Sequence, residues 1–251
     1  MKSIVLVAAI ALATTACGSD VTRRPEATPS GPPTIQPEIV TRHAEQFDVD
    51  VPTRRAGSQE EQVAATYLLG HLGNAGYATL LDGVPVGNLV RSTNVIALPP
   101  GASEPQVVVV VSYDTGPDED PSGLAIGVWL ELARALRVAN EDHGVSFAAL
   151  GAEKAETEGG RLGSRRLVQY LRDQERKPFV IVLSTVSKTG GLVVDGDRAG
   201  EINGPGARTT IGFESPTREV FEAAGFEAAV VAGGADAVGD ALLHYLTTGA
   251  G

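Results

Sequence analysis

The chain has one cysteine, few aromatic residues and fewer basic than acidic residues. Cys17 is the only cysteine, so no disulfide can form within the chain. Aromatic residues make up 5% of the sequence, and Ala, Val and Gly must therefore fill most of the interior. Lys and Arg total 20 against 31 Asp and Glu, and this acidic excess argues against nucleic acid as a partner. The sequence also lacks a Gly-x-Ser-x-Gly motif and a phosphate-binding glycine pattern, so it contains neither a nucleophile elbow nor a phosphate loop.

The apolar run near the N-terminus is too short to cross a bilayer. It extends from Ile4 to Ala13 and has the length of a signal-peptide core. The small residue Ala16 directly precedes Cys17, a pattern that resembles a bacterial lipoprotein signal. We expect residues 1–16 to be removed and Cys17 to carry palmitate-type chains, which would anchor the protein to a bacterial cell membrane on its extracytoplasmic side. The alternative is ordinary signal cleavage, which would leave Cys17 as a thiol.

The rest of the chain divides into a tether and one domain. Residues 17–37 are rich in Pro, Thr and Ser without apolar periodicity, which predicts a disordered tether. Residues 38–251 alternate strand and helix patterns, which predicts a single α/β domain with a mostly parallel sheet. We expect strands at 93–98, 107–111, 145–150, 179–185 and 228–231. We expect helices at 59–74, 122–138, 162–176, 217–224 and 236–246.

The valine run 107–111 is the most informative strand pattern. Five consecutive valines are typical of a strand buried on both faces, as in the centre of a parallel sheet. The run is followed by an acidic loop that contains Asp114, Asp118, Glu119 and Asp120. Because ligands bind beyond the carboxyl ends of strands in open α/β sheets, we expect the functional site here. The loop lacks the spacing of a calcium loop, and a solvated acidic loop is the simpler interpretation.

A series of short motifs in a characteristic order covers residues 54–185. The motifs are Arg55-Ala56-Gly57-Ser58, Gly76-Tyr77, Asn94-Val95-Ile96-Ala97, Tyr113-Asp114, Ser122-Gly123, Glu131-Leu132-Ala133-Arg134-Ala135-Leu136, Gly151-Ala152-Glu153 and Leu162-Gly163-Ser164. In this order the chain resembles the zinc-dependent aminopeptidases and exopeptidases of metallopeptidase clan MH, family 28, which include bacterial leucyl aminopeptidases and glutaminyl cyclases. The resemblance implies a three-layer αβα, zinc-exopeptidase-like (phosphorylase/hydrolase-like) fold and a cleft that holds two zinc ions.

The positions that this resemblance assigns to the zinc ligands carry other residues. They are Ser112 for the first His, Glu119 beside Asp120 for the bridging Asp, Lys154 for the second member of a Glu-Glu pair, Ser184 for a strand-end Asp, and Ser215-Pro216-Thr217 for the last His. Glu153 remains at the position of the catalytic base. Hydroxyl groups are poor zinc ligands and an ammonium is repelled by a dication. We therefore expect no metal and no other cofactor.

The remaining polar residues leave two questions open. The four histidines, His43, His71, His143 and His244, fall elsewhere in the sequence and are interpreted as surface or helix-side residues. Asp114 would orient a ligand His in the family, but here it has no such partner. Lys154 is expected either to pair with Glu119, Glu153 or Asp114, replacing part of the lost metal charge, or to point into solvent.

Three functions are compatible with this sequence. The first is a pseudoenzyme that binds a peptide or protein ligand in the inherited cleft, or acts as a scaffold. The second is a working peptidase or hydrolase that uses Glu153 with an unconventional metal site or with none. The third is a binder of a small molecule or cation through the acidic loop, in which Glu119 would take part. We favour the first, because every expected zinc ligand is changed.

Overall fold

The computed structural model describes residues 33–101, 105–117, 123–138, 144–202, 208–209 and 213–248. All of them belong to one compact unit that spans Gly31–Gly251. Cys17, Glu119, Asp120 and His143 lie outside the described residues. Within the described ranges, every helix is too short or too polar to cross a membrane.

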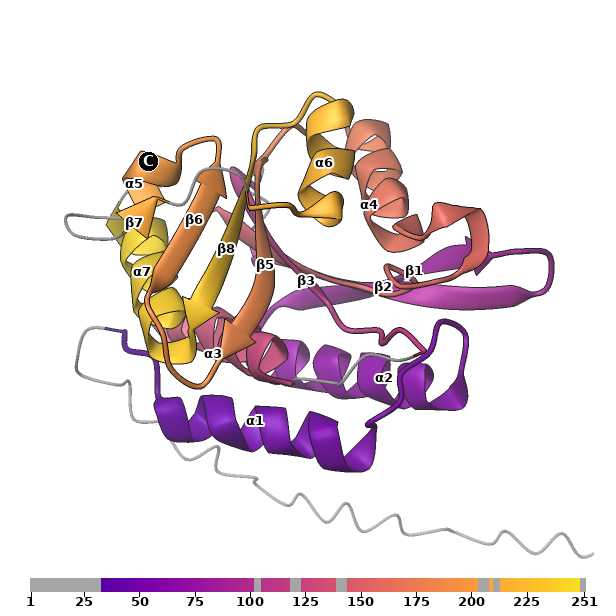
Figure 1. The fold of residues 1–251 in the computed structure, drawn as a ribbon, viewed down its shortest axis with the longest axis horizontal. Coiled ribbons are helices and arrows are strands. Elements are labelled where there is room, and N and C mark those ends of the chain that lie inside the picture. Colours follow the sequence, from indigo (N-terminus) through magenta and orange to yellow (C-terminus); the bar gives the residue numbers. More distant parts are fainter. Residues whose placement is uncertain are drawn as a thin grey trace, which may run out of the picture. The chain divides into compact units, whose positions relative to one another are not determined.

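An eight-stranded mixed sheet forms the middle layer of this unit (Figure 1). Its strands are β1 (Ala78–Val86), β2 (Val90–Leu98), β3 (Val107–Ser112), β4 (Val145–Leu150), β5 (Phe179–Ser187), β6 (Leu192–Gly196), β7 (Arg208–Thr209) and β8 (Ala228–Gly234). They are ordered β1-β2-β4-β3-β5-β8-β6-β7. The central strands β4, β3, β5 and β8 run parallel, whereas β1, β2 and β6 pair antiparallel with their neighbours toward the centre.

Helices cover both faces of the sheet (Figure 1). One face carries α1 (Pro37–Asp50), α2 (Gln59–Asn74), α3 (Leu124–Val138) and α7 (Ala235–Thr248), with the short α5 (Ala199–Ile202) near the sheet edge. The other face carries α4 (Leu162–Asp173) and α6 (Pro216–Ala223). A single 3₁₀ turn, η1 (Thr157–Gly159), precedes α4. The predicted fold class, a single α/β domain with three layers and a mostly parallel central sheet, is confirmed.

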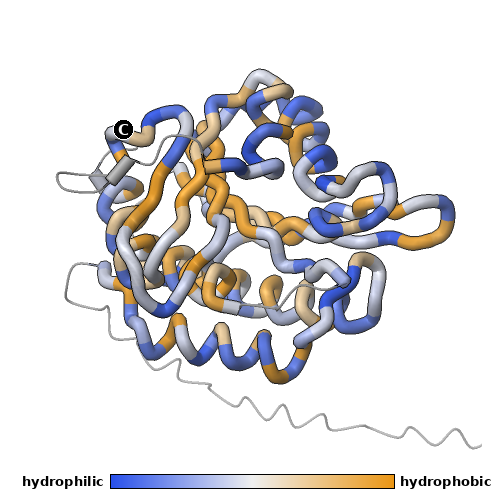
Figure 2. Tube along the Cα trace, in the orientation of Figure 1, coloured by the Kyte–Doolittle hydropathy of each residue, from blue (hydrophilic) through white to orange (hydrophobic). Residues whose placement is uncertain are grey.

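Strand β3 separates two hydrophobic cores. Val107, Val109 and Val111 belong to the core beneath α1, α2, α3 and α7, and the two valines between them belong to the core beneath α4 and α6. Figure 2 shows the hydrophobic residues gathered along these central strands. Trp129 of α3 is fully buried and its indole N–H donates to the Val109 carbonyl at 3.0 Å. Burial of both strand faces explains the uninterrupted valine run.

The packed region begins earlier than residue 38, where the sequence placed the domain boundary. Ile35 is only 8% exposed, and the Gln36 N–H donates to the buried Glu131 carboxylate of α3 at 2.9 Å. The end of the predicted tether 17–37 is therefore part of the packed structure. A fully buried carboxylate requires donors, and Gln36 supplies one of them while Arg134 supplies another at 2.6 Å.

Several elements were absent from the sequence prediction, among them helix α1 and strand β1. Helix α1 has signals that were available, because Pro37 stands in its first turn and its buried residues Val40, Ala44 and Phe47 follow helical spacing. Strand β1 contains Gly83 and Pro85, which argue against a central strand. It forms nevertheless, because it is an edge strand and pairs only with β2.

Candidate functional site

A cleft of about 270 Å³ lies beyond the carboxyl ends of β3 and β5, as the sequence predicts. Its lining includes Ser112 from β3, Ser184 from β5, and Asp114 and Lys154 from the loops after β3 and β4. Thr217, in the first turn of α6, closes one side. The structure thus brings together residues that sequence reasoning selected from distant parts of the chain, namely Ser112, Asp114, Lys154, Ser184 and the segment Ser215-Pro216-Thr217.

Glu153 lies beneath this cleft and is fully buried. One carboxylate oxygen, Oε1, accepts the Ser164 N–H at 2.6 Å, and the other, Oε2, accepts the Thr217 hydroxyl at 2.8 Å. Burial raises the pKa of Glu153, and the hydrogen bonds from Ser164 and Thr217 oppose that rise. Both carboxylate oxygens of Glu153, which the resemblance places as the catalytic base, therefore already accept hydrogen bonds from the protein.

The turn after β4 that presents Glu153 is held by side chains from other elements. Ala152 lies in the left-handed region with a φ of 56°. The Gly151 N–H donates to the Asn94 side-chain oxygen at 3.2 Å, and the Asn94 amide donates to the Gly163 carbonyl at 2.9 Å. A Cβ atom at Gly163 would overlap the Gly151 carbonyl. Asn94, Gly151 and Gly163, all members of the ordered motifs, thus fix the start of α4 against this turn.

Asp114 is buried with half of its carboxyl group satisfied. Its Oδ2 accepts the Lys154 main-chain N–H at 2.7 Å. Its Oδ1 is buried and has no hydrogen-bond partner among the described residues. Burial, with a smaller contribution from the nearby Glu153 and Glu61 carboxylates, raises the pKa of Asp114 to about 7, although the main-chain N–H of Lys154 opposes the rise. The cleft wall therefore contains one buried carboxylate oxygen without a hydrogen-bond partner among the described residues.

Among the ion pairs between described residues, none joins the Lys154 ammonium to Asp114 or Glu153, two of the partners that the charge-replacement hypothesis considered. The ion pairs found within the described ranges join other residues, and Lys154 contacts Asp114 through its main-chain N–H instead. Glu119, the third partner considered, lies outside these ranges, so pairing with it stays a prediction.

Two arginines that sequence reasoning did not select also line the cleft. Arg54 is 2% exposed, and its guanidinium donates to the carbonyls of Tyr113 at 2.6 Å and Val51 at 2.7 Å. Arg161 precedes α4 in the left-handed region, and its Nη1 donates to the Glu153 carbonyl at 2.5 Å. The Arg161 Nε is buried without an acceptor in the described part of the chain. Nothing in the local sequence separates these two from the exposed arginines beside them.

The described residues of the cleft do not fit a pair of zinc ions. Across the described ranges, no three His, Cys, Asp or Glu side chains come together in a way that could hold a metal ion. Ser112, Ser184 and Thr217 contribute hydroxyl groups to the cleft lining, whereas zinc sites are built from His, Cys and carboxylate ligands.

The described histidines lie away from the cleft. The His43 Nδ1 lies 2.8 Å from the Tyr67 hydroxyl, and the His43 and His71 rings are 4.7 Å apart between α1 and α2. Burial lowers the pKa of His43 to about 4, and the neighbouring His71 and Arg42 add to this effect. His244 is exposed on α7. These positions agree with their interpretation as helix-side or surface residues.

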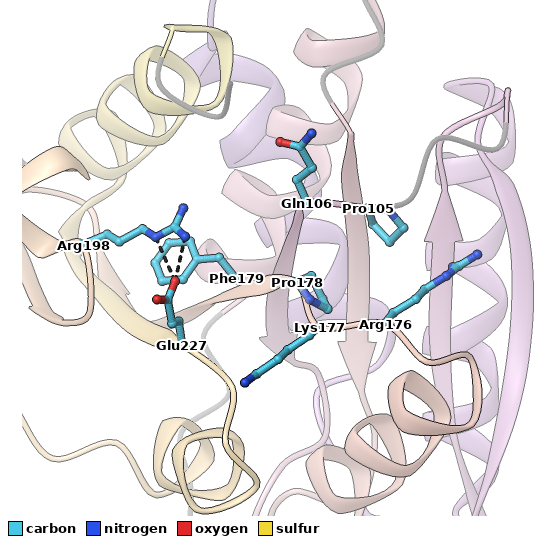
Figure 3. Close-up of a pocket in the computed structure, with 8 residues that line it drawn as sticks. All are labelled: Pro105, Gln106, Arg176, Lys177, Pro178, Phe179, Arg198 and Glu227. Carbon is cyan, nitrogen blue, oxygen red and sulfur yellow. Dashed lines mark hydrogen bonds and ion pairs between the residues drawn. The ribbon is translucent and has the colours of Figure 1, made fainter.

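A second pocket of about 490 Å³ lies at the opposite, amino ends of β3 and β5 (Figure 3). Arg198 is held there by an ion pair with Glu227 at 2.7 Å and lies over the Phe179 ring at 4.9 Å. Figure 3 shows Arg176 and Lys177 extending away from each other, so their charges do not converge on one point. This pocket therefore lacks the concentrated polar groups that the cleft has.

Comparison with known proteins gives one sequence relative. The alkaline phosphatase isozyme conversion protein of Escherichia coli is 26% identical over 164 residues, which cover 53% of this chain and 46% of that protein. The chain thus spans less than half the length of this curated relative. No family model matches the chain.

Solved structures share the fold over most of the chain. A leucine aminopeptidase precursor from Bacteroides thetaiotaomicron matches with a TM-score of 0.73 and 16% identity, covering 87% of this chain and 99% of that one. A glutaminyl cyclase from Tannerella forsythia matches with a TM-score of 0.73 and 15% identity, covering 86% and 99%. The fold is therefore the zinc-exopeptidase-like fold that the sequence resemblance implied.

Proposed function

We propose that this chain is a degenerate member of the zinc-dependent aminopeptidases of family 28, in which the inherited cleft binds a peptide or protein ligand without zinc catalysis. The observation that carries this proposal is the pair of hydrogen bonds from Ser164 and Thr217 to Glu153. A general base must reach the proton that it removes, directly or through one water. Glu153 is fully buried and both of its oxygens already accept hydrogen bonds from the protein.

The surrounding residues support the same function. Ser112, Ser184 and the segment Ser215-Pro216-Thr217 stand where the resemblance places zinc ligands, and hydroxyl groups hold zinc poorly. These hydroxyls, together with Asp114, still give the cleft polar groups that can recognise a ligand. In this proposal the site lacks the side chains that would coordinate zinc but keeps the shape and the polar groups that are needed to bind a ligand.

Metal content and turnover test this proposal directly. Purified protein that is incubated with zinc and then dialysed is expected to retain far less than one zinc ion per chain. It is also expected to leave a panel of aminoacyl and peptide substrates uncleaved, with or without added metal. An active zinc aminopeptidase treated in parallel is the control.

Stoichiometric zinc together with chelator-sensitive turnover would overturn the proposal and favour a working hydrolase. In that case Glu153→Gln would abolish turnover, because Glu153 would supply the base.

We also propose that the protein is anchored outside the cytoplasm by lipid on Cys17, with the segment after it as a tether. The sequence pattern before Cys17 supports this, and an acyl-glycerol anchor with more than one chain gives stable attachment. Wild-type protein expressed in a bacterial host is expected to incorporate labelled palmitate and enter the detergent phase of Triton X-114. Cys17→Ser is expected to do neither. An unlabelled wild-type protein with a reactive thiol would show ordinary signal cleavage instead.

A further inference from the structure

The cleft contains two buried polar atoms of opposite hydrogen-bonding character that lack partners. Asp114 Oδ1 is an acceptor and Arg161 Nε is a donor, and each is buried without a hydrogen bond among the described residues. Both side chains line the same cleft. Buried polar atoms in proteins are nearly always hydrogen-bonded, so such a pair indicates a ligand that brings one donor and one acceptor.

The charges around the cleft narrow the chemistry of that ligand. A simple cation could pair with Asp114 or with Glu214 at the exposed rim, but it would also meet the positive charges of Arg54, Lys154 and Arg161. A simple anion would be drawn to these basic residues, yet it would leave the Asp114 oxygen unsatisfied and be repelled by it. A ligand with both charges avoids both penalties.

The first turn of α6 adds a second feature that favours a negatively charged group of the ligand. Pro216 and Thr217 line the cleft, and Ser215 caps the helix by accepting the Arg218 N–H at 3.3 Å. The N-terminal end of a helix favours negative charge, which here would lie on the side of the cleft that α6 forms. The cavity of about 270 Å³ is at the lower end of the size of ligand pockets, so the ligand is small.

We infer that the cleft binds a small zwitterion of the α-amino acid type, with its ammonium group on Asp114 Oδ1 and its carboxylate group toward Arg161 and the start of α6. Ser112 and Ser184, which also line the cleft, offer hydroxyl groups to the rest of the ligand. This inference rests on the proposed function, because it requires a cleft in which zinc does not occupy the space beside Asp114.

Calorimetric titration of the purified protein with four matched probes tests this inference. L-alanine and L-alanyl-L-alanine carry both charges, L-alaninamide carries only the positive one, and N-acetyl-L-alanine carries only the negative one. The zwitterions are expected to bind, and the two singly charged probes are expected to bind about tenfold more weakly or worse, because each loses one charge-assisted contact.

Two variants locate the contacts. Asp114→Asn is expected to weaken zwitterion binding about tenfold and to reduce the preference for L-alanine over N-acetyl-L-alanine. Arg161→Gln is expected to reduce the preference over L-alaninamide in the same way. Arg176→Gln, in the second pocket (Figure 3), is the matched control and should bind like the wild type.

The probe series in the wild-type protein keeps the inference testable even if a variant does not fold. Equal binding of the zwitterions and either singly charged probe would overturn it, and so would no zwitterion binding at millimolar concentrations. Binding of longer peptides without this charge preference would overturn the inference and leave the proposed function standing. Stoichiometric zinc with turnover would overturn the proposed function itself.

Discussion

Replacing Arg54 with leucine is expected to lower the free energy of unfolding by about 3 kcal/mol or more. The guanidinium is 2% exposed and donates to the carbonyls of Tyr113 and Val51. Leucine would leave these buried carbonyls without a donor, at a cost of about 1–3 kcal/mol each. Urea unfolding at neutral pH measures the loss.

Neighbouring substitutions separate this effect from a general loss of charge. Arg55 is exposed, so Arg55→Leu is expected to change the free energy of unfolding by less than about 0.5 kcal/mol. Arg54→Lys is expected to lie between the two, because one ammonium cannot reproduce the planar donor fork. Equal stability of Arg54→Leu and Arg55→Leu would contradict the role given to Arg54.

The consequence of losing Arg54 extends to the cleft. The Thr115 N–H donates to the Arg54 carbonyl at 3.0 Å, and the Arg54 N–H donates to the Thr115 hydroxyl at 2.9 Å. Arg54 therefore ties the segment after α1 to the loop after β3, which carries Asp114. These bonds of the Arg54 main chain remain in Arg54→Leu, but the guanidinium bond to the carbonyl of Tyr113, directly before Asp114, is lost. We therefore expect Arg54→Leu to weaken the positioning of Asp114 as well as the fold.

The sequence was most informative where burial dictates composition. The valine run of β3 must be apolar on both faces because a core lies on each side of it, and this made both the strand and its central place predictable. Helix α2 was also predicted with its observed bounds, since Ser58 caps it by accepting the Glu61 N–H at 3.1 Å. Strand β6 was missed because it lies in a glycine-rich interval and pairs only through distant residues of β7 and β8.

The site was predictable only in part for a related reason. Parallel strands end at the same edge, so Ser112 and Ser184 could be expected to meet. The bond between Thr217 and Glu153 joins residues 64 positions apart and depends on how α6 lies over the sheet, which no local pattern encodes. The same holds for Arg54 and Arg161, whose sequence neighbours include other arginines that are more exposed.

The second large effect that we expect is a loss of stability as the pH rises, caused by Asp114. Its ordinary pKa is 3.8, and burial raises the pKa to about 7 in the folded protein. Between these values the folded state holds the proton more tightly than the unfolded state. The contribution of Asp114 to stability is therefore fully present below about pH 4 and is lost as the pH rises through about 7.

Comparison of the wild type with Asp114→Asn isolates this contribution. The free energy of unfolding of the wild type, relative to the variant, is expected to fall between pH 4 and pH 8 by up to about 4 kcal/mol. Asp173→Asn, at the exposed end of α4, controls for removal of one negative charge. Parallel pH profiles for the wild type and Asp114→Asn would contradict the expected burial effect.

A third variant tests the source of the shift. The Glu153 and Glu61 carboxylates add to the rise in the Asp114 pKa that burial causes. Glu153→Gln removes one of these charges and keeps one acceptor oxygen, which can face the Ser164 N–H while the new amide N–H donates to the Thr217 hydroxyl oxygen. The pH range over which stability is lost should then move to lower pH, because less repulsion opposes ionisation of Asp114. An unchanged range would assign the shift to burial and Glu61, and would leave Glu153 as a purely structural acceptor beneath the cleft.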